Sequence, residues 1–156
     1  RGIPVGADSI SPNRHAEVKS ISDLLNFTKY VRDCSGKPTG IKCVIGQTQW
    51  LDEFCQRIVH QGLEFAPDFI TVDSGDGGTG AAPLSLMDHT GLPIKRSLPI
   101  VVDKLMEYGL RERIRIIASG RLVNPADVAA ALCLGADCVN SARGFMFALG
   151  CIQSFQ

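Results

Sequence analysis

Four short apolar segments recur along this chain, and stretches with helical periodicity separate them. The segments cover residues 40–45, 68–72, 114–118 and 136–140. They are rich in β-branched and other apolar residues with little polar alternation, which is typical of strands buried on both faces of a parallel sheet. Strands that alternate with helices predict an α/β fold.

The segments between these strands carry helical spacing and helix-end signals. Five apolar residues after the first strand share one helical face: Leu51, Phe54, Cys55, Ile58 and Val59. Ser20 and Asp23 resemble a capping box before the first strand. Asn124 and Pro125 predict a helix start after the third strand, with a side-chain cap followed by proline at the first helical position.

The length of the chain limits how much of a barrel it can form. A complete (β/α)8 barrel needs about 250 residues, and 156 residues have room for four βα units preceded by one helix. We therefore expect residues 1–156 to form one partial domain. Arg1 stands where an initiator Met is expected, which suggests a piece of a longer protein.

Composition and charge argue against several classes of partner. The chain has 16 basic residues (Lys and Arg) and 16 acidic residues (Asp and Glu), so neither nucleic acid nor an anionic membrane is expected as a partner. No segment reaches the roughly 20 apolar residues of a membrane span. The six cysteines form no Cys-x-x-Cys pair and several lie in apolar runs, which predicts reduced, mostly buried thiols in a cytoplasmic protein.

Two loops after the third and fourth strands have the character of a phosphate site. In βα folds the site lies beyond the carboxyl ends of the strands. Gly120 in Ser119-Gly120-Arg121 allows the backbone to approach an anion closely, and Arg143 can bind phosphate through two hydrogen bonds. Ser141 offers a hydroxyl donor. The alternative is a tight turn followed by a surface arginine.

The loop after the second strand is rich in glycine over residues 73–83. Glycine there is unfavourable for folding entropy, so close approach of the backbone to a planar ligand would explain it. A flexible surface loop is the alternative. No Gly-Lys-Ser/Thr follows, so it is not a Walker A loop.

Lys42 lies within the first apolar strand. Its side chain either reaches solvent at the strand end or points into a barrel mouth. In the mouth it would stabilise negative charge or form a Schiff base with a carbonyl substrate.

Several stretches occur in the same order as in a known family. They are Ile10-Ser11-Pro12, Gly40-Ile41-Lys42, Asp76-Gly77-Gly78-Thr79-Gly80-Ala81, Ala118-Ser119-Gly120 and Leu149-Gly150-Cys151-Ile152. Over nearly the whole chain the sequence resembles the FMN-binding synthase domain of glutamate synthases, including shorter single-domain relatives of the large subunit. The resemblance implies the C-terminal half of a (β/α)8 TIM barrel.

The resemblance also implies a reaction and a set of site residues. In that family FMN lies at the barrel mouth with a [3Fe–4S] cluster beside it, and reduced flavin passes a hydride to 2-iminoglutarate, formed from 2-oxoglutarate and ammonia, to give glutamate. Lys42 then lies near the flavin ring or substrate, and Cys151 is the first cluster ligand. The implied cofactor-binding residues are Lys42, Asp76, Gly77, Gly78, Thr79, Gly120, Arg121, Ser141, Ala142 and Arg143.

Departures from the family pattern leave steps of this reaction open. Cys151 is not followed by further cysteines, and one thiolate cannot hold a cluster that needs several. Residue 1 is Arg and not the nucleophilic Cys of an amidotransferase domain. The electron donor and the nitrogen source, ammonia or glutamine, therefore stay open, and we expect this chain alone to form no glutamate.

Two other hypotheses belong to different classes. The first is an aldolase-like, phosphate-binding barrel with Lys42 as Schiff base, although no carboxylate is clearly placed beside that lysine in the sequence. The second is a non-catalytic half-barrel that dimerises through its open sheet edges.

Overall fold

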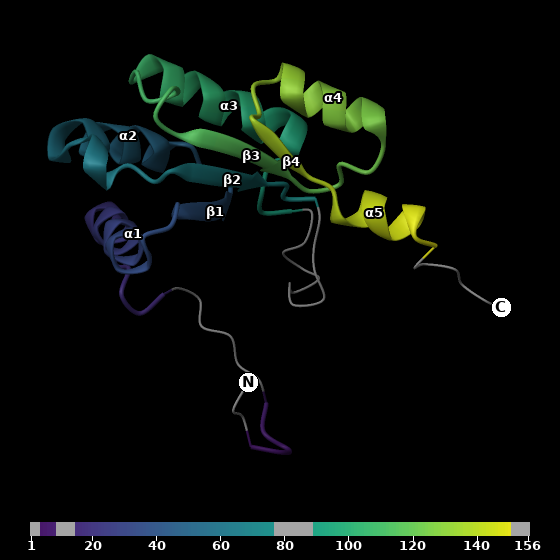
Figure 1. Cartoon of the computed structure of the whole chain (residues 1–156), viewed down its shortest axis with the longest axis horizontal. Helices are drawn as coiled ribbons and strands as arrows, with labels where there is room; N and C mark the ends of the chain where they lie inside the picture. Colours follow the sequence, from purple (N-terminus) through teal and green to yellow (C-terminus); the bar gives the residue numbers. More distant parts are fainter. Residues whose placement is uncertain (1–3, 9–14, 77–88, 151–156) are drawn as a thin grey trace.

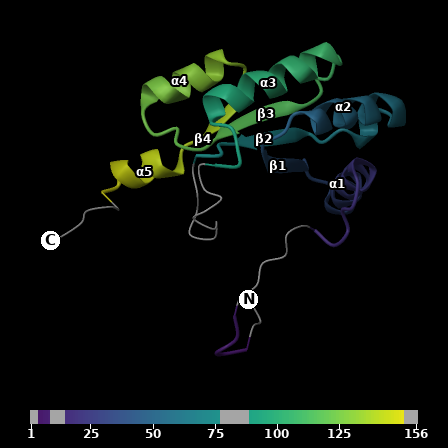
Figure 2. The same cartoon turned by 180° about the vertical axis from the view of Figure 1, so that it is seen from behind.

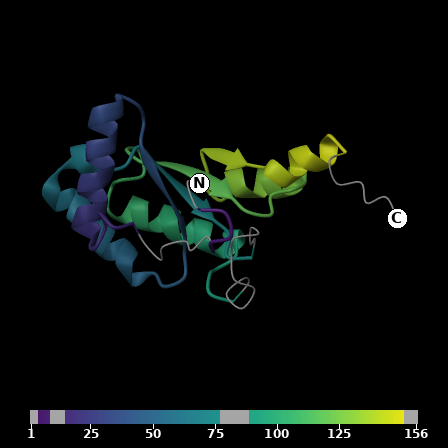
Figure 3. The same ribbon diagram turned by 90° about the horizontal axis from the view of Figure 1, so that it is seen from below.

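The computed structural model describes residues 4–8, 15–76 and 89–150. The elements follow in the order α1 (Ile21–Ser35), β1 (Gly40–Val44), α2 (Gln49–Gln61), the short 3-10 helix η1 (Leu63–Phe65), β2 (Phe69–Asp73), α3 (Ile94–Glu107), β3 (Arg115–Ser119), α4 (Pro125–Cys133), β4 (Cys138–Asn140) and α5 (Ala142–Ala148). Figure 1 shows this βα alternation after the first helix. Helices α1 and α5 lie at opposite ends of the molecule (Figure 3).

Within the described residues, four parallel strands form one sheet in the order β1-β2-β3-β4. Each strand pairs with the next one in the sequence, as consecutive strands of a (β/α)8 barrel do. The register pairs Val44 with Asp73 and Asp73 with Ser119, and then Ser119 with Asn140. The predicted α/β fold with about four parallel strands is confirmed, and these four residues lie side by side at the carboxyl ends.

The two faces of the sheet differ in what covers them. Helices α2, α3 and α4 lie on the same side of the sheet in opposite views (Figures 1 and 2). Ile70, Val72 and Ile116 are buried there in the core. On the other face Lys42 and Arg115 are exposed. The prediction of strands buried on both faces is therefore wrong for β1, β3 and β4, because side chains alternate between a helix-covered face and an open one.

The helix starts follow the predicted caps. The Asp23 N–H donates to Ser20 Oγ at 3.1 Å ahead of α1, and the Asp127 N–H donates to Asn124 Oδ1 at 2.9 Å ahead of α4. Each cap satisfies a backbone N–H that has no partner inside its helix. Pro125 occupies the first helical position of α4, as predicted.

Helix α2 buries a narrower stripe than its sequence predicts. The buried residues are Leu51, Phe54, Cys55 and Ile58, whereas Val59 is exposed. Gly62 follows the last helical residue, as expected for the end of this helix. None of the helices in the described ranges is long and apolar enough to cross a membrane.

The cysteine prediction fails for most of the described thiols. Cys55 is buried and Cys43 is partly buried, but Cys34, Cys133 and Cys138 are exposed. Cys151 lies outside the described residues. Apolar neighbours in the sequence do not tell which face of a helix or strand a cysteine occupies.

Burial raises the pKa of the Cys43 and Cys55 thiols to about 11, and the negative charge of a neighbouring carboxylate contributes less to this rise. Both cysteines are therefore neutral thiols at pH 7.

Asp137 joins two strands at their amino ends. Its Oδ2 accepts the Ile116 N–H of β3 at 2.7 Å and lies 2.8 Å from Arg111 Nη2, while Oδ1 lies 3.3 Å from Arg115 Nη1. Partial burial by itself raises the pKa of Asp137, but the Ile116 N–H and the two guanidinium groups outweigh it and hold that pKa below its usual value.

Asp68 has the same role at the neighbouring strand pair, β1 and β2. Its Oδ2 accepts the Thr39 N–H at 2.8 Å, just before β1, and Oδ1 lies 3.1 Å from Arg113 and 3.4 Å from Arg32. Two carboxylates thus tie neighbouring strands together at the end of the sheet opposite the βα loops, the end that serves stability in barrels.

We expect Asp137→Asn to lower the free energy of unfolding at pH 7 by about 1–3 kcal/mol, because a charge-assisted hydrogen bond and two ion pairs are lost. A lowered folded-state pKa contributes stability above the unfolded pKa of about 3.9, and this contribution disappears as the pH falls through the folded value. Urea unfolding at pH 7 and pH 3 measures the difference. Asp103→Asn, on the exposed side of α3, is the control, and an equal loss at both pH values would contradict the account.

Candidate functional site

A cavity of about 290 Å³ lies at the carboxyl ends of the strands. Its lining residues are Lys42, Asp73, Ser119, Gly120, Arg121, Leu122, Asn140, Ser141, Ala142, Arg143 and Met146. The structure thereby brings together six predicted site residues: Lys42, Gly120, Arg121, Ser141, Ala142 and Arg143. All four strands contribute because parallel strands end at the same edge of a sheet. The ligand roles of these residues stay predictions.

Lys42 is paired with a carboxylate that was not predicted to belong to the site. Lys42 Nζ lies 2.7 Å from Asp73 Oδ2. The expectation that no carboxylate is placed beside this lysine is therefore wrong. Asp73 ends β2 directly after an apolar run, so the position of strand carboxyl ends in α/β folds was the signal available for finding it.

Asp76 is not among the residues that line the cavity, but it is linked to the cavity through Arg121. Arg121 Nη1 is 3.9 Å from Asp76 Oδ2, and the Ser74 hydroxyl donates to Asp76 Oδ1. Ser74 Oγ also accepts the Ile94 N–H at 3.0 Å, at the first residue of α3. Ser74 is 3% exposed. It was missed in the sequence because a lone serine in a glycine-rich loop carries no distinguishing pattern.

The predicted residues Gly77, Gly78, Thr79 and Cys151 lie outside the described residues. The described part of the glycine-rich segment packs closely against the backbone of residues 91–92, just before α3. The Gly75 N–H donates to Leu92 O at 2.9 Å, and a Cβ on Gly75 would lie 2.5 Å from Gly91 Cα. Close packing against Gly91 therefore accounts for the glycine at position 75.

The turn after β3 has a backbone that restricts its residues. Gly120 has φ 105°, and Arg121, with φ 51°, is the only non-glycine residue of the described ranges with positive φ. A Cβ on Gly120 would lie 2.3 Å from Ser74 Cβ. Gly120 is thus required by its packing against Ser74 as well as by its backbone conformation. A left-handed non-glycine residue stores strain, which is common at functional sites.

The Ser141 hydroxyl has a partner inside the protein. It donates to the carbonyl oxygen of Leu122, which ties the loop after β4 to the loop after β3. A hydroxyl has one proton to donate, so in this structure Ser141 joins the two loops and presents lone pairs, rather than a donor, to the cavity.

The cavity is electropositive. Lys42, Arg121 and Arg143 line it together with Asp73, which leaves cations in excess at neutral pH. Such a surface suits an anionic group, and guanidinium groups bind phosphate through two parallel hydrogen bonds. In the described residues of the chain, no cluster of three His, Cys, Asp or Glu side chains is arranged to hold a metal ion.

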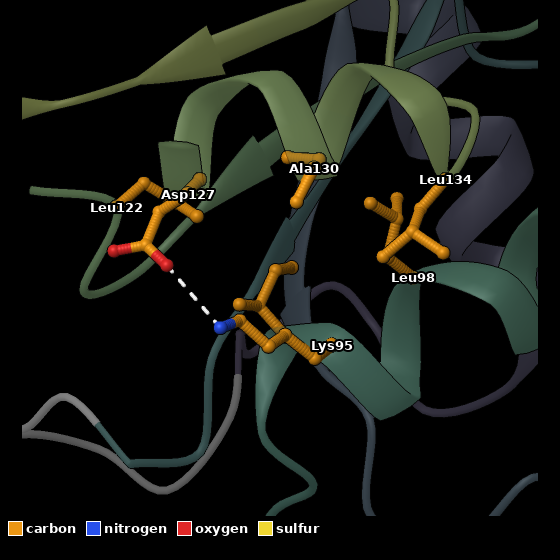
Figure 4. A pocket seen from close by; sticks show the side chains of 8 residues that line it. Lys95, Leu98, Leu122, Asp127, Ala130 and Leu134 are labelled. Carbon is orange, nitrogen blue, oxygen red and sulfur yellow. Dashed lines mark ion pairs between the residues drawn. The ribbon is translucent and has the colours of Figure 1, made fainter. Parts of the chain in front are cut away.

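A second, much smaller hollow lies between α3 and α4 (Figure 4). Its volume of about 10 Å³ has room for no more than a water molecule. Leu98, Leu122 and Leu134 line it, and Lys95 Nζ pairs with Asp127 Oδ1 at 3.2 Å at its rim. This hollow is a packing feature between two helices and not a ligand site.

Consecutive parallel βα units with a polar site at the carboxyl ends of the strands are the arrangement found in (β/α)8 barrels. Residues 1–155 match the sequence model of the conserved region in glutamate synthase. The chain is 46% identical over 154 residues to a glutamate synthase large subunit-like protein of Bacillus subtilis, YerD, covering 99% of this chain and 29% of that protein. The chain belongs to the glutamate synthase family.

Other relatives agree with this assignment. An archaeal-type glutamate synthase [NADPH] of Thermotoga neapolitana is 37% identical over 153 residues, with 97% of this chain and 29% of that protein covered. The chain thus spans under a third of the length of these curated relatives. A solved flavocytochrome b2 variant with pyruvate bound superposes with a TM-score of 0.57 at 22% identity, covering 86% of this chain and 29% of that one. This likeness supports the barrel fold, and the family comparisons confirm the resemblance.

We expect Gly120→Ala to destabilise the protein more than Gly109→Ala does. Gly109 has φ 68°, in the left-handed region that costs a non-glycine residue about 1–2 kcal/mol, and nothing lies within 4 Å of a Cβ there. Gly120 has φ 105°, which lies outside that region and is less favourable still for a residue with a side chain. The overlap with Ser74 adds about 1–3 kcal/mol at position 120. Urea unfolding of the two variants measures the difference, and equal losses would show that packing against Ser74 contributes nothing.

Proposed function

We propose that this chain forms the FMN-binding side of a glutamate synthase-like oxidoreductase. The observation that carries the proposal is the meeting of Lys42, Gly120, Arg121 and Arg143 in one electropositive cavity at the carboxyl ends of the strands. The family assignment supports it, because this chain matches the conserved region over nearly its whole length.

The residues present fit a phosphate group at the end of the cavity formed by the loops after β3 and β4. Arg143 and Arg121 supply guanidinium donors, and Gly120 leaves its backbone accessible from the cavity side. Ala142 has a small side chain beside them. A volume of about 290 Å³ is at the lower limit of known ligand pockets, so the cavity suits one end of FMN rather than the whole molecule.

Lys42 lies across the cavity from the loop after β4 and would face the flavin ring or the substrate. FMN, when bound, supplies hydride transfer. The Lys42 ammonium group would stabilise negative charge that develops on a reduced ring or on a substrate carboxylate. Asp76 orients Arg121 through their ion pair.

The proposed overall reaction is the reductive amination of 2-oxoglutarate. Ammonia, free or derived from glutamine, condenses with the keto group and releases water to give 2-iminoglutarate. A hydride and a proton then give glutamate. The curated relatives are more than three times as long as this chain, so this reaction is proposed for a protein that contains the chain. Cys151, the ligand that the family resemblance implies for a [3Fe–4S] cluster, lies outside the described residues.

The Lys42–Asp73 pair also keeps the aldolase-like hypothesis open to test. A Schiff-base lysine needs a neighbouring group for proton transfer, and Asp73 lies 2.7 Å from Lys42 Nζ. Borohydride trapping of a carbonyl compound on Lys42 would favour this chemistry.

Formation of a dimer through the outer strands β1 and β4 is a separate proposal, and light scattering that shows a monomer would overturn it.

We expect FMN to bind the purified chain saturably, with quenching of flavin fluorescence, and riboflavin to bind much more weakly because it lacks the phosphate. Arg143→Ala should lower the affinity for FMN about tenfold to a hundredfold, the usual loss for a charge-assisted hydrogen bond. It should leave the affinity for riboflavin unchanged.

The matched control is Arg57→Ala, which removes an exposed arginine from α2 and should leave FMN binding unchanged. Equal affinities for FMN and riboflavin would show that these loops are not a phosphate site. Absence of FMN binding at any concentration would overturn the proposed function for this chain.

A further inference from the structure

The position of Lys42 in its strand does not by itself bring the ammonium group to the site. Lys42 is paired in register with Thr71, whereas Asp73 is paired with Val44, two residues closer to the carboxyl end. The lysine side chain must therefore extend along the open face of the sheet to reach Asp73 Oδ2, 2.7 Å from Nζ. A lysine that is 61% exposed has many rotamers open to it, so its direction needs a cause.

Asp73 is itself held from two sides. Its Oδ1 accepts the Ser74 N–H at 3.0 Å, and that N–H also points to Ser119 O at 2.9 Å in the neighbouring strand. A Cβ on Gly120 would lie 3.1 Å from Asp73 Oδ1, so the turn after β3 packs against the carboxylate. Asp73 is 20% exposed. The less mobile partner of the pair is therefore the carboxylate.

The chain contains a comparable ion pair outside the site. Lys95 and Asp127 are 67% and 22% exposed, close to the values of Lys42 and Asp73, and lie at the rim of the small hollow between α3 and α4 (Figure 4). Exposed ion pairs contribute little to stability. The Lys42–Asp73 pair therefore affects the direction and charge of the ammonium group more than it affects folding.

We propose that Asp73 is a positioning residue for Lys42. Its fixed carboxylate draws the ammonium group to the carboxyl end of the sheet and offsets some of its charge. The excess positive charge of the cavity then lies toward Arg143, because Arg121 is itself paired with Asp76. If the chain binds FMN as proposed above, Asp73 sets how strongly Lys42 stabilises the reduced ring.

The first test needs no flavin. The Lys42 ammonium signal in proton–nitrogen NMR spectra, identified by its loss in Lys42→Arg, reports how fast its protons exchange with water. Asp73→Asn keeps an oxygen for the Ser74 N–H and removes the charge, and it should speed exchange at Lys42 severalfold. Asp127→Asn should leave Lys42 unchanged. Unaltered Lys42 exchange in Asp73→Asn would overturn the proposal.

The second test uses the FMN-loaded chain and the midpoint potential of the flavin. If Asp73 positions Lys42, the effect of Lys42→Met on the ratio of reduced to oxidised flavin depends on Asp73. The factor by which Lys42→Met changes this ratio should differ by about twofold or more between the wild-type chain and the Asp73→Asn variant. Two charges that act independently give additive effects, and additivity would overturn the proposal. If FMN does not bind, the proposed function fails, and the ammonium exchange still decides the role of Asp73.

Discussion

The register of the parallel sheet is the constraint on which the arrangement of this protein depends. Backbone hydrogen bonds align the last residues of neighbouring strands, so Asp73, Ser119 and Asn140 come side by side although long helical segments separate them in the sequence. A shift by one residue would turn every side chain of a strand to the other face. Lys42 would then point into the helix layer, and the cavity would lose one of its three cations.

Close packing around Ser74 makes this edge of the sheet rigid. Its backbone N–H and hydroxyl contact Asp73, Asp76, Ser119 and Ile94, which joins β2, β3 and the start of α3. Gly120 permits this contact because a side chain there would overlap Ser74. The glycines of the βα turns thus serve the internal packing of the site, and the same small residues leave the cavity open.

The two ends of the sheet are built for different purposes. At the amino ends, Asp68 and Asp137 are bonded to backbone N–H groups and arginines, and these contacts hold their pKa values low. At the carboxyl ends, the charged groups lie around a cavity, and cations outnumber carboxylates among its lining residues. Charges satisfied by fixed partners stabilise the fold, whereas cations in excess leave binding capacity for a ligand.

Local patterns in the sequence determined much of this protein. Helix caps at Ser20 and Asn124, the strand segments and the order of βα units depend on residues close together in the chain. The caps and the order were predicted correctly, and the ends of the strands to within two residues. The partnership of Lys42 with Asp73, the contacts of Ser74 and the exposure of Cys133 and Cys138 were not, because each depends on which face or neighbour an element meets. Spacing along the chain defines elements and their ends, but only packing between distant segments decides which polar side chains meet.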